Sequence, residues 1–216
     1  MLTIFEELLL LSIHENKGTF IRSSIERIKL GLVGAVIAEL GLMGKIQDSN
    51  NHRLHLADDS QTGDDILNEA IATLKAADKD RKFGYWINNL ISKPEKLRKQ
   101  ITERLIGKEV LTLEDEIMVW VVPSSLQPDV SASTKYWVNE RLRGIVLAQK
   151  ESQPHDIALL SLIKACELLD LIFLRDERKL AARYINELVV SQAMKDPTIQ
   201  TIQEIETAIA AVVEED

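Results

Sequence analysis

The chain has 216 residues, of which 45% are hydrophobic and 28% are charged, and this composition is that of an ordinary globular protein. Its formal net charge of −8 argues against binding to nucleic acid or to anionic membranes through overall charge. The single cysteine, Cys166, excludes an internal disulfide, and nine glycines and five prolines leave little room for long linkers. We therefore expect residues 1–216 to form one domain.

The first predicted element is a helix over residues 2–13, LTIFEELLLLSI. Thr3 and Glu6 have the spacing of a capping box, and Asn16-Lys17-Gly18 provides a stop signal. The stretch has neither the positive start nor the cleavage site of an export signal, and it is far shorter than the roughly 20 residues of a membrane-spanning helix. It is predicted to be a helix of the core.

A second capping box, Ser23 with Glu26, opens a long helix that we expect to end near Met43, before Gly44. Small residues recur three and four positions apart along its middle: Gly31, Gly34, Ala35, Ala38 and Gly41. An interior glycine costs a helix up to about 1 kcal/mol, and close packing against other helices is the expected compensation. This helix is predicted to be the innermost one.

The rest of the chain reads as helices joined by short loops and hairpins. Further helices are expected from 62–65 to about 77, within FGYWINNLI, from Pro94 to about Ile106, and over 133–149, 156–174, 176–191 and 198–213. Hairpins are expected at 46–56 and within VLTLEDEIMVWVV, the latter with an acidic turn at Glu114–Glu116. ELGLMGKI and ERLIGKEV each end a helix before a hairpin, which suggests winged-helix-like units.

Positive charge is concentrated in residues 93–108, against the sign of the whole chain. Two acidic residues, Glu95 and Glu103, accompany six basic ones, a local sum of 6 − 2 = +4: Lys93, Lys96, Arg98, Lys99, Arg104 and Lys108. A core stripe of Leu97, Ile101 and Leu105 would leave Lys96 and Lys99 facing solvent. The segment is either a solvated helix face or, near the positive end of a helix, a site for a phosphate or an anionic headgroup.

No catalytic motif stands out. In HRLH, His52 and His55 would point to opposite faces of a strand, which makes them a poor metal pair, and no cysteine or acidic cluster stands at ligand spacing. Cys166 lies in an apolar segment, where we expect a small buried side chain. We therefore predict no enzyme, no metal site and no cofactor. The tryptophans are expected in the core, although one beside a basic pocket can rest in a membrane interface: Trp86, Trp120 and Trp137.

Six segments carry a resemblance to a known family. They are LTIFEELLLLSI (2–13), GLVGAVIAELGLMGKI (31–46), TGDDILNEAI (62–71), YWINNLIS (85–92), ERLIGKEVLT (103–112) and HDIALLSLIKACELLDLIF (155–173). In this order they resemble the Golgi phosphoprotein 3 family, whose eukaryotic members are non-catalytic Golgi adaptors. The resemblance implies one mainly α domain around a central helix bundle with short β-hairpins. It also implies a basic pocket for phosphatidylinositol 4-phosphate and a role in holding glycosyltransferases at the Golgi by their cytosolic tails.

The headgroup pocket of the family maps onto this sequence in part. Two arginines one helical turn apart precede the ERL motif in the family; the second falls on Arg98, and the first falls near Glu95, with Lys96 and Lys99 beside it. A third arginine of the family falls on Val33, and Lys29, one turn earlier, can reach toward a similar place.

Other features depart from the family pattern. The pocket tryptophan would fall near Ser24–Ile25 and is missing, and the turn at Glu114–Glu116 is acidic, which an anionic membrane would repel. The chain begins at the LT motif, whereas eukaryotic members place a coat-recruiting tail before it. These departures favour a prokaryotic-type member and leave the identity of the lipid open.

The sequence thus predicts a non-enzymatic cytoplasmic adaptor, peripheral at the cytosolic membrane face. Lys29, Lys96, Arg98 and Lys99 are the residues expected to contact a phosphoinositide or another acidic headgroup, at about 1 kcal/mol per basic residue. Such weak binding would need a protein partner or oligomerisation for stable residence. The alternative is a soluble module that binds protein partners and no lipid. DNA binding through winged-helix-like units is disfavoured by the net charge.

Overall fold

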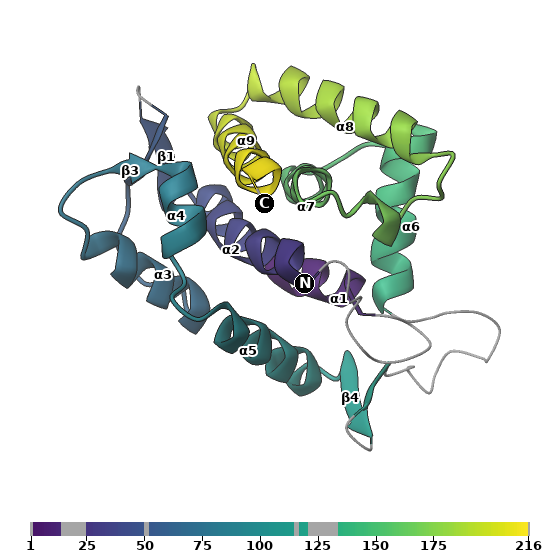
Figure 1. Ribbon diagram of the computed structural model, residues 1–216, viewed down its shortest axis with the longest axis horizontal. Helices are drawn as coiled ribbons and strands as arrows, with labels where there is room; N and C mark the ends of the chain where they lie inside the picture. Colours follow the sequence, from purple (N-terminus) through teal and green to yellow (C-terminus); the bar gives the residue numbers. More distant parts are fainter. Residues whose placement is uncertain (1, 14–24, 50–51, 115–116, 121–133, 216) are drawn as a thin grey trace.

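The computed structural model describes residues 2–13, 25–49, 52–114, 117–120 and 134–215 (Figure 1). The helices are α1 (Ile4–Leu11), α2 (Ile25–Leu42), α3 (Asp65–Lys75), α4 (Phe83–Asn89), α5 (Pro94–Gly107), α6 (Thr134–Ala148), α7 (Pro154–Ala165), α8 (Arg178–Ala193) and α9 (Pro197–Glu215), with a 3-10 turn, η2 (Leu169–Leu171). The strands are β1 (Ile46–Ser49), β2 (Arg53–Leu56), β3 (Arg81–Lys82), β4 (Leu111–Glu114) and β5 (Ile117–Trp120). The prediction of a mainly α fold is confirmed.

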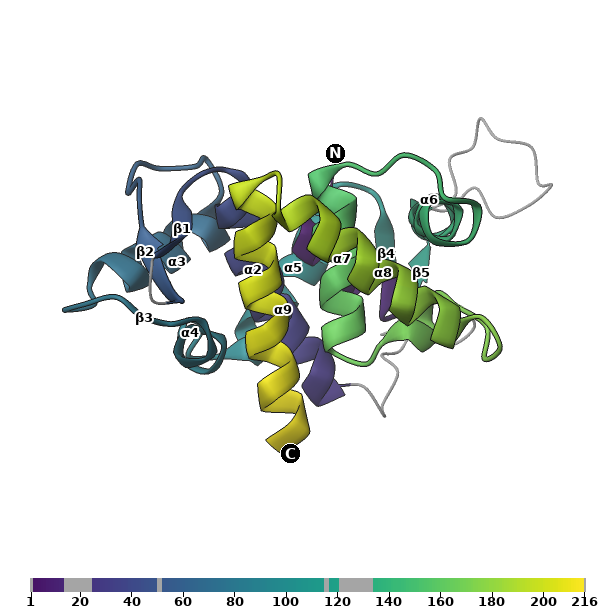
Figure 2. The ribbon, with the colours of Figure 1, turned by 90° about the horizontal axis from the view of Figure 1, so that it is seen from above.

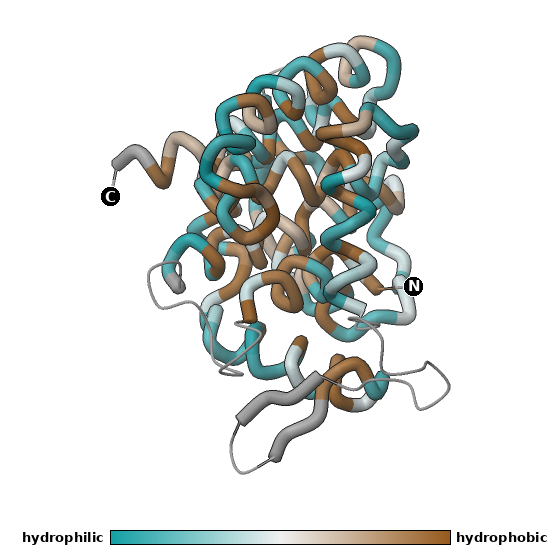
Figure 3. Tube along the Cα trace, turned by 90° about the vertical axis from the view of Figure 1, so that its right-hand side faces the viewer, coloured by the Kyte–Doolittle hydropathy of each residue, from teal (hydrophilic) through white to brown (hydrophobic). Residues whose placement is uncertain are grey.

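Helix α2 lies at the centre of the molecule. In Figure 1, α3, α4 and α5 lie on one side of it and α7, α8 and α9 on the other, and Figure 2 shows α7 and α9 running side by side. Helices α1, α7 and α9 all pack against α2. Along each exposed helix hydrophobic and hydrophilic residues alternate in short stretches (Figure 3), as expected of helices that bury one face. Among the described residues, no helix is both long and apolar enough to cross a bilayer.

The small residues of α2 allow its neighbours to approach closely. A Cβ atom added at Gly31 would lie 3.0 Å from Leu8 Cδ2 and 3.1 Å from Cys166 Sγ. At Gly34 it would collide with Ile209 and lie 2.9 Å from Leu162 Cδ2. These contacts come from α1, the end of α7 and α9, so the prediction that this helix is the innermost is confirmed.

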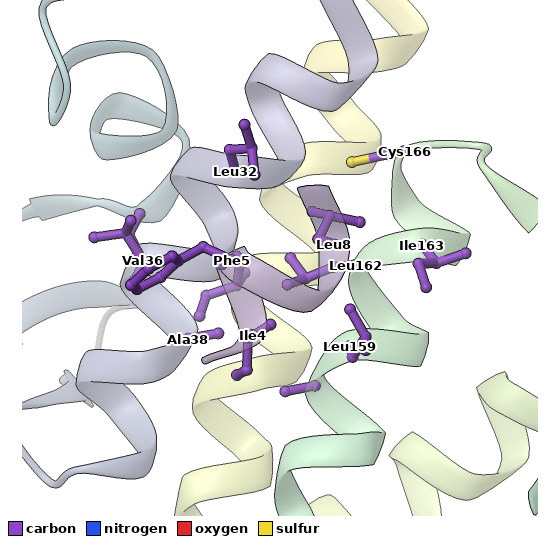
Figure 4. Packing of buried hydrophobic residues seen from close by; sticks show 14 of the residues in the cluster. Ile4, Phe5, Leu8, Leu32, Val36, Ala38, Leu159, Leu162, Ile163 and Cys166 are labelled. Carbon is purple, nitrogen blue, oxygen red and sulfur yellow. The ribbon is translucent and has the colours of Figure 1, made fainter. Parts of the chain in front are cut away.

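Helix α1 is buried along its whole length, including two carboxylates, Glu6 and Glu7. Figure 4 shows its hydrophobic side chains between α2 and α7. The predicted capping box is present: Thr3 Oγ1 accepts a hydrogen bond from the Glu6 amide, and Glu6 Oε2 accepts one from the Thr3 amide at 2.8 Å. The helix ends at Leu11 with Ser12 as its C-cap, and both the predicted stop at 16–18 and Ser23 of the second capping box lie outside the described residues.

Both predicted hairpins are present, and one strand was missed. β1 pairs antiparallel with β2 from Ile46–Leu56 to Ser49–Arg53, and β4 pairs with β5. β3 pairs antiparallel with β2, with Arg53 opposite Lys82, and adds a third strand to the sheet. A strand of two residues is too short for the alternation that marks strands in a sequence. Residues 115–116 of the predicted acidic turn lie outside the described part of the chain.

The prediction of a helix over roughly 156–174 is correct to within two residues at its start and wrong at its end. α7 begins at Pro154 and stops at Ala165, after which Glu167 has a positive φ of 53° and the chain continues through η2. The residues after α7 are as buried as the helix itself, among them Cys166, Leu168 and Phe173. Hydrophobicity therefore continues past the helix, and no glycine marks the end.

Three helices end with the same backbone motif. After α2, Gly44 has a φ of 70°, and the Lys45 amide donates to the carbonyl of Leu40; after α5, Glu109 has a φ of 57°, and the Val110 amide donates to Leu105. Glu167 repeats the pattern after α7. This is the Schellman motif, but it does not account for the Gly-Lys that ELGLMGKI and ERLIGKEV share, because Gly44 is left-handed whereas Gly107 is the last helical residue of α5. Glycine adopts the left-handed conformation readily, but glutamate does so at a cost.

Replacing Glu109 by glycine should stabilise the protein. Relief of the left-handed glutamate should raise the free energy of unfolding by about 1 kcal/mol, measured by urea denaturation. Glu103→Gly, in the exposed middle of α5, is the matched control and should lower it by about 1 kcal/mol. A loss of stability in Glu109→Gly would contradict this account of the helix end.

Candidate functional site

Helix α5 presents the basic segment as the sequence predicts. Pro94 occupies the first helical position, where its missing amide hydrogen costs no helical hydrogen bond. The stripe of Leu97, Ile101 and Leu105 is buried, which leaves the side chains of Lys96 and Lys99 exposed by 55% and 78%. The amino-terminal half of α5 therefore carries its charges at the surface.

The other half of the segment turns its charges inward. Arg104 forms a bidentate ion pair with Asp64, the N-cap of α3. The Lys108 ammonium donates to both carboxylate oxygens of the buried Glu6, at 2.7 and 2.8 Å. These two cations neutralise acidic groups from distant parts of the chain, so the local sum of +4 overstates the positive surface.

An ion pair between Lys29 and Glu95 links α2 to the first turn of α5. Its Nζ lies 2.8 Å from Glu26 and 2.8 Å from Glu95. Hydrogen bonds to Glu26 and then Glu95 raise the pKa of Lys29, while the bond from Lys29, together with a backbone amide, lowers the pKa of Glu95. Arg98, one turn along α5, also acts electrostatically on Glu95. The structure thus gathers Lys29 and Arg98 around one carboxylate in the first turn of α5.

The two remaining predicted residues have weaker partners. Lys96 Nζ lies 3.5 Å from the carboxylate of Glu69 on α3, and Lys99 Nζ lies 3.8 Å from Glu103 one turn along the same helix. Both pairs are exposed to solvent, where an ion pair contributes little stability. Either lysine can therefore exchange its partner for another anion at small cost.

A hollow of about 240 Å³ lies beside Lys29, between α2, α4 and the start of α5. It is lined by Glu26, Lys29, Leu30, Val33, Ile87, Asn88, Ile91, Pro94 and Val212. Lys29 and Val33, one turn apart on α2, thus share a hollow with the first residue of α5. Val33 is the position where the family resemblance places one pocket arginine, but the lining is mainly apolar and has one amine.

A second hollow of about 280 Å³ adjoins the first along α5. Ile91 lines both, and the second also contains Lys93, Lys96 and Glu69. Arg98 and Lys99 line neither of these two hollows. The predicted residues therefore surround the first turns of α5 without converging on one cavity.

A group of buried charges on α1 was missed by the sequence analysis. The guanidinium of Arg141 on α6 bridges Glu7, at 2.5 Å, and Asp156, at 2.8 Å. His155 Nε2 lies 3.2 Å from Glu7, and Glu39 accepts a hydrogen bond from the amide of Ile4 at 2.8 Å. The available signal was the pair of glutamates inside an otherwise apolar helix, since buried charges need partners.

The environment of this group shifts two pKa values in opposite directions. Burial lowers the pKa of His155, but its hydrogen bond to Glu7 and the charges of Glu7 and Glu39 outweigh burial and raise it above 6.5. Burial raises the pKa of Glu7, but hydrogen bonds from His155 and Arg141 outweigh burial and lower it below 4.5. Each group thereby favours the charged form of the other.

The tryptophans lie in different environments. Trp86 is buried, as predicted, whereas the side chain of Trp137 on α6 is 61% exposed, so the prediction of a core position is wrong for Trp137. It lines a wide hollow of about 610 Å³ together with Lys108, Val110 and Arg141. The side chain of Trp120 lies outside the described part of the structure.

The comparisons with known proteins agree with the resemblance. A family model described as Golgi phosphoprotein 3 (GPP34) matches residues 4–205. The chain belongs to the Golgi phosphoprotein 3 family. It is 23% identical to "Vacuolar protein sorting-associated protein 74" of Eremothecium gossypii over 167 residues, covering 68% of this chain and 49% of the relative. The chain thus spans about half the length of that relative.

The family match includes all four residues predicted to contact a headgroup. Lys29, Lys96, Arg98 and Lys99 all lie within the matched range, as do the two hollows beside α5 with the exception of Val212. Membership therefore confirms the family that the sequence suggests, while the use of these residues for a headgroup stays a prediction.

The pair of Glu7 and His155 predicts a dependence of stability on pH. The raised pKa of His155 adds stability that is complete below pH 6.5 and is lost as pH rises through the folded value. The lowered pKa of Glu7 adds stability that is complete above pH 4.5 and is lost as pH falls. The melting temperature, measured from below pH 4.5 to well above pH 6.5, should fall above pH 6.5 in the unaltered protein. His155→Gln should abolish this fall. An unchanged decline in this variant would contradict the assignment.

Proposed function

We propose that this member of the Golgi phosphoprotein 3 family is a non-catalytic cytoplasmic adaptor that binds peripherally to membranes. Its ligand is an anionic headgroup, a phosphoinositide or another acidic lipid, held beside the first turns of α5. The observation that carries the proposal is the hollow that Lys29 and Val33 share with Pro94. It brings Val33, where the family resemblance places one pocket arginine, and Lys29 beside the first residue of α5, the helix that carries Lys96, Arg98 and Lys99.

The charges beside the hollow suit reversible binding. Lys96 and Lys99 extend into solvent from the same end of α5, and their partners Glu69 and Glu103 are also exposed. Near an anionic surface each basic side chain contributes about 1 kcal/mol. A few such contacts give weak binding, so a protein partner or a second copy of the chain would add the attachment needed for stable residence.

The ion pairs also favour a second candidate function, a module that binds protein partners and no lipid. Lys29, Lys96 and Lys99 each have a carboxylate within 4 Å. Val33 stands where the family resemblance places an arginine. In this alternative, α5 is a solvated face whose charges are balanced within the protein.

Charge reversal on α5 separates the two functions. Lys96→Glu with Lys99→Glu should abolish binding to anionic vesicles, since both residues would then repel the surface. The matched control is Lys179→Glu with Arg183→Glu, an equal change of charge on the exposed face of α8, which should retain binding. Co-sedimentation would use phosphatidylcholine vesicles alone, with phosphatidylglycerol, and with phosphatidylinositol 4-phosphate.

The vesicle series has a distinct outcome for each function. Binding only to phosphatidylinositol 4-phosphate supports a specific pocket, and binding to every anionic vesicle with steep salt dependence supports a general electrostatic contact. No binding to any vesicle would favour the protein-interaction module. Equal loss in both double variants would contradict the placement of the site on α5.

Neutralising Glu95 should strengthen lipid binding. Its carboxylate pairs with Lys29 and acts electrostatically on Arg98, so Glu95→Gln removes one of the two carboxylates that bind Lys29 and a negative charge that a phosphate would meet. The gain should be about fivefold in affinity for anionic vesicles, which corresponds to about 1 kcal/mol. Glu187→Gln on α8 removes the same charge at an exposed position and should give no comparable gain. Equal effects of the two variants would contradict a local role for Glu95.

A further inference from the structure

Three metal-ligating side chains meet where the β1–β2 hairpin lies against α9. Asp48 comes from β1, His52 from the turn and Glu204 from α9, and one ligand atom of each lies within 4.8 Å of the others. His52 Nδ1 is 2.9 Å from Glu204 Oε1 and 3.8 Å from Asp48 Oδ2. The sequence analysis treated His52 as a strand residue; the structure places it in the turn, with a positive φ of 53°, while His55 pairs with Asp80.

A second observation concerns Asp48 itself. Its side chain is only 11% exposed, and its buried Oδ1 accepts no hydrogen bond among the described residues. A buried acceptor without a donor is uncommon in proteins, and a bound cation is one of the arrangements that satisfies it.

We propose that Asp48, His52 and Glu204 bind a divalent transition metal ion, with Zn²⁺ as the best match. One imidazole and two carboxylates are ligands that Zn²⁺ accepts, whereas Mg²⁺ and Ca²⁺ prefer oxygen ligands alone. Tetrahedral zinc places its ligand atoms about 3.4 Å apart, and the two distances from His52 lie on either side of this value.

His52 brings the cluster to the surface of the protein. The side chain of His52 is 71% exposed, so it can adjust by rotation and the fourth coordination position faces solvent. A bound ion would neutralise the two facing carboxylates and join the hairpin to α9. This site shares no residue with the headgroup site, so the two proposals stand or fall separately.

The test uses the full chain after treatment with a chelator. Calorimetric titration with ZnCl₂ should show one ion per chain, and Zn²⁺ should raise the melting temperature. His52→Ala and Glu204→Gln should each weaken binding by at least about tenfold, because a three-ligand site loses a ligand. His55→Ala is the matched control, since it removes the other hairpin histidine, and it should bind as the unaltered chain does.

The Asp48→Asn variant distinguishes the loss of a metal ligand from a loss of folding. Without metal this variant should melt no lower than the unaltered chain, because it removes the repulsion from Glu204. Added Zn²⁺ should then fail to raise its melting temperature. The proposal is overturned if Zn²⁺ does not bind, if MgCl₂ binds as well as ZnCl₂, or if His52→Ala and His55→Ala weaken binding equally.

Discussion

The arrangement of the helices depends on two carboxylates that α1 carries into the core. Lys108, just after α5, neutralises Glu6, while Arg141 of α6 and His155 of α7 neutralise Glu7. A buried carboxylate left without its partner costs several kcal/mol, so these helices are stable only where they bring cations to α1. Helix α2 also packs closely against α1, because its small residues allow α1 to approach at short distance.

Helix α5 consequently has two ends with different roles. Near its carboxyl end, Arg104 and Lys108 belong to the interior network, since they pair with Asp64 and Glu6. At its amino end Lys96 and Lys99 reach solvent, and Lys96 lines the second hollow together with Lys93. The charge summed along the sequence does not distinguish these two groups, whereas the structure separates two inward-facing cations from lysines that are exposed to solvent.

Features set by neighbouring residues were predictable from the sequence, and features set by distant ones were not. The capping box at Thr3, both hairpins and the small-residue stripe of α2 are local patterns, and each is confirmed. The end of α7 was missed because Glu167, where glycine is usual, adopts the left-handed conformation. In the candidate site, the exposure of Lys96 followed from helical periodicity, but the bond between Lys29 and Glu95 joins two helices and has no local signal.

The burial of α1 also has a consequence for synthesis on the ribosome. Its charge partners lie 102 to 148 residues further along the chain. At about 5–20 residues per second, roughly 7 to 30 seconds separate the synthesis of α1 from that of His155. During this time a helix with four consecutive leucines has no completed core to enter. We therefore expect α1 to dock late and to be the segment most in need of a chaperone in the nascent chain.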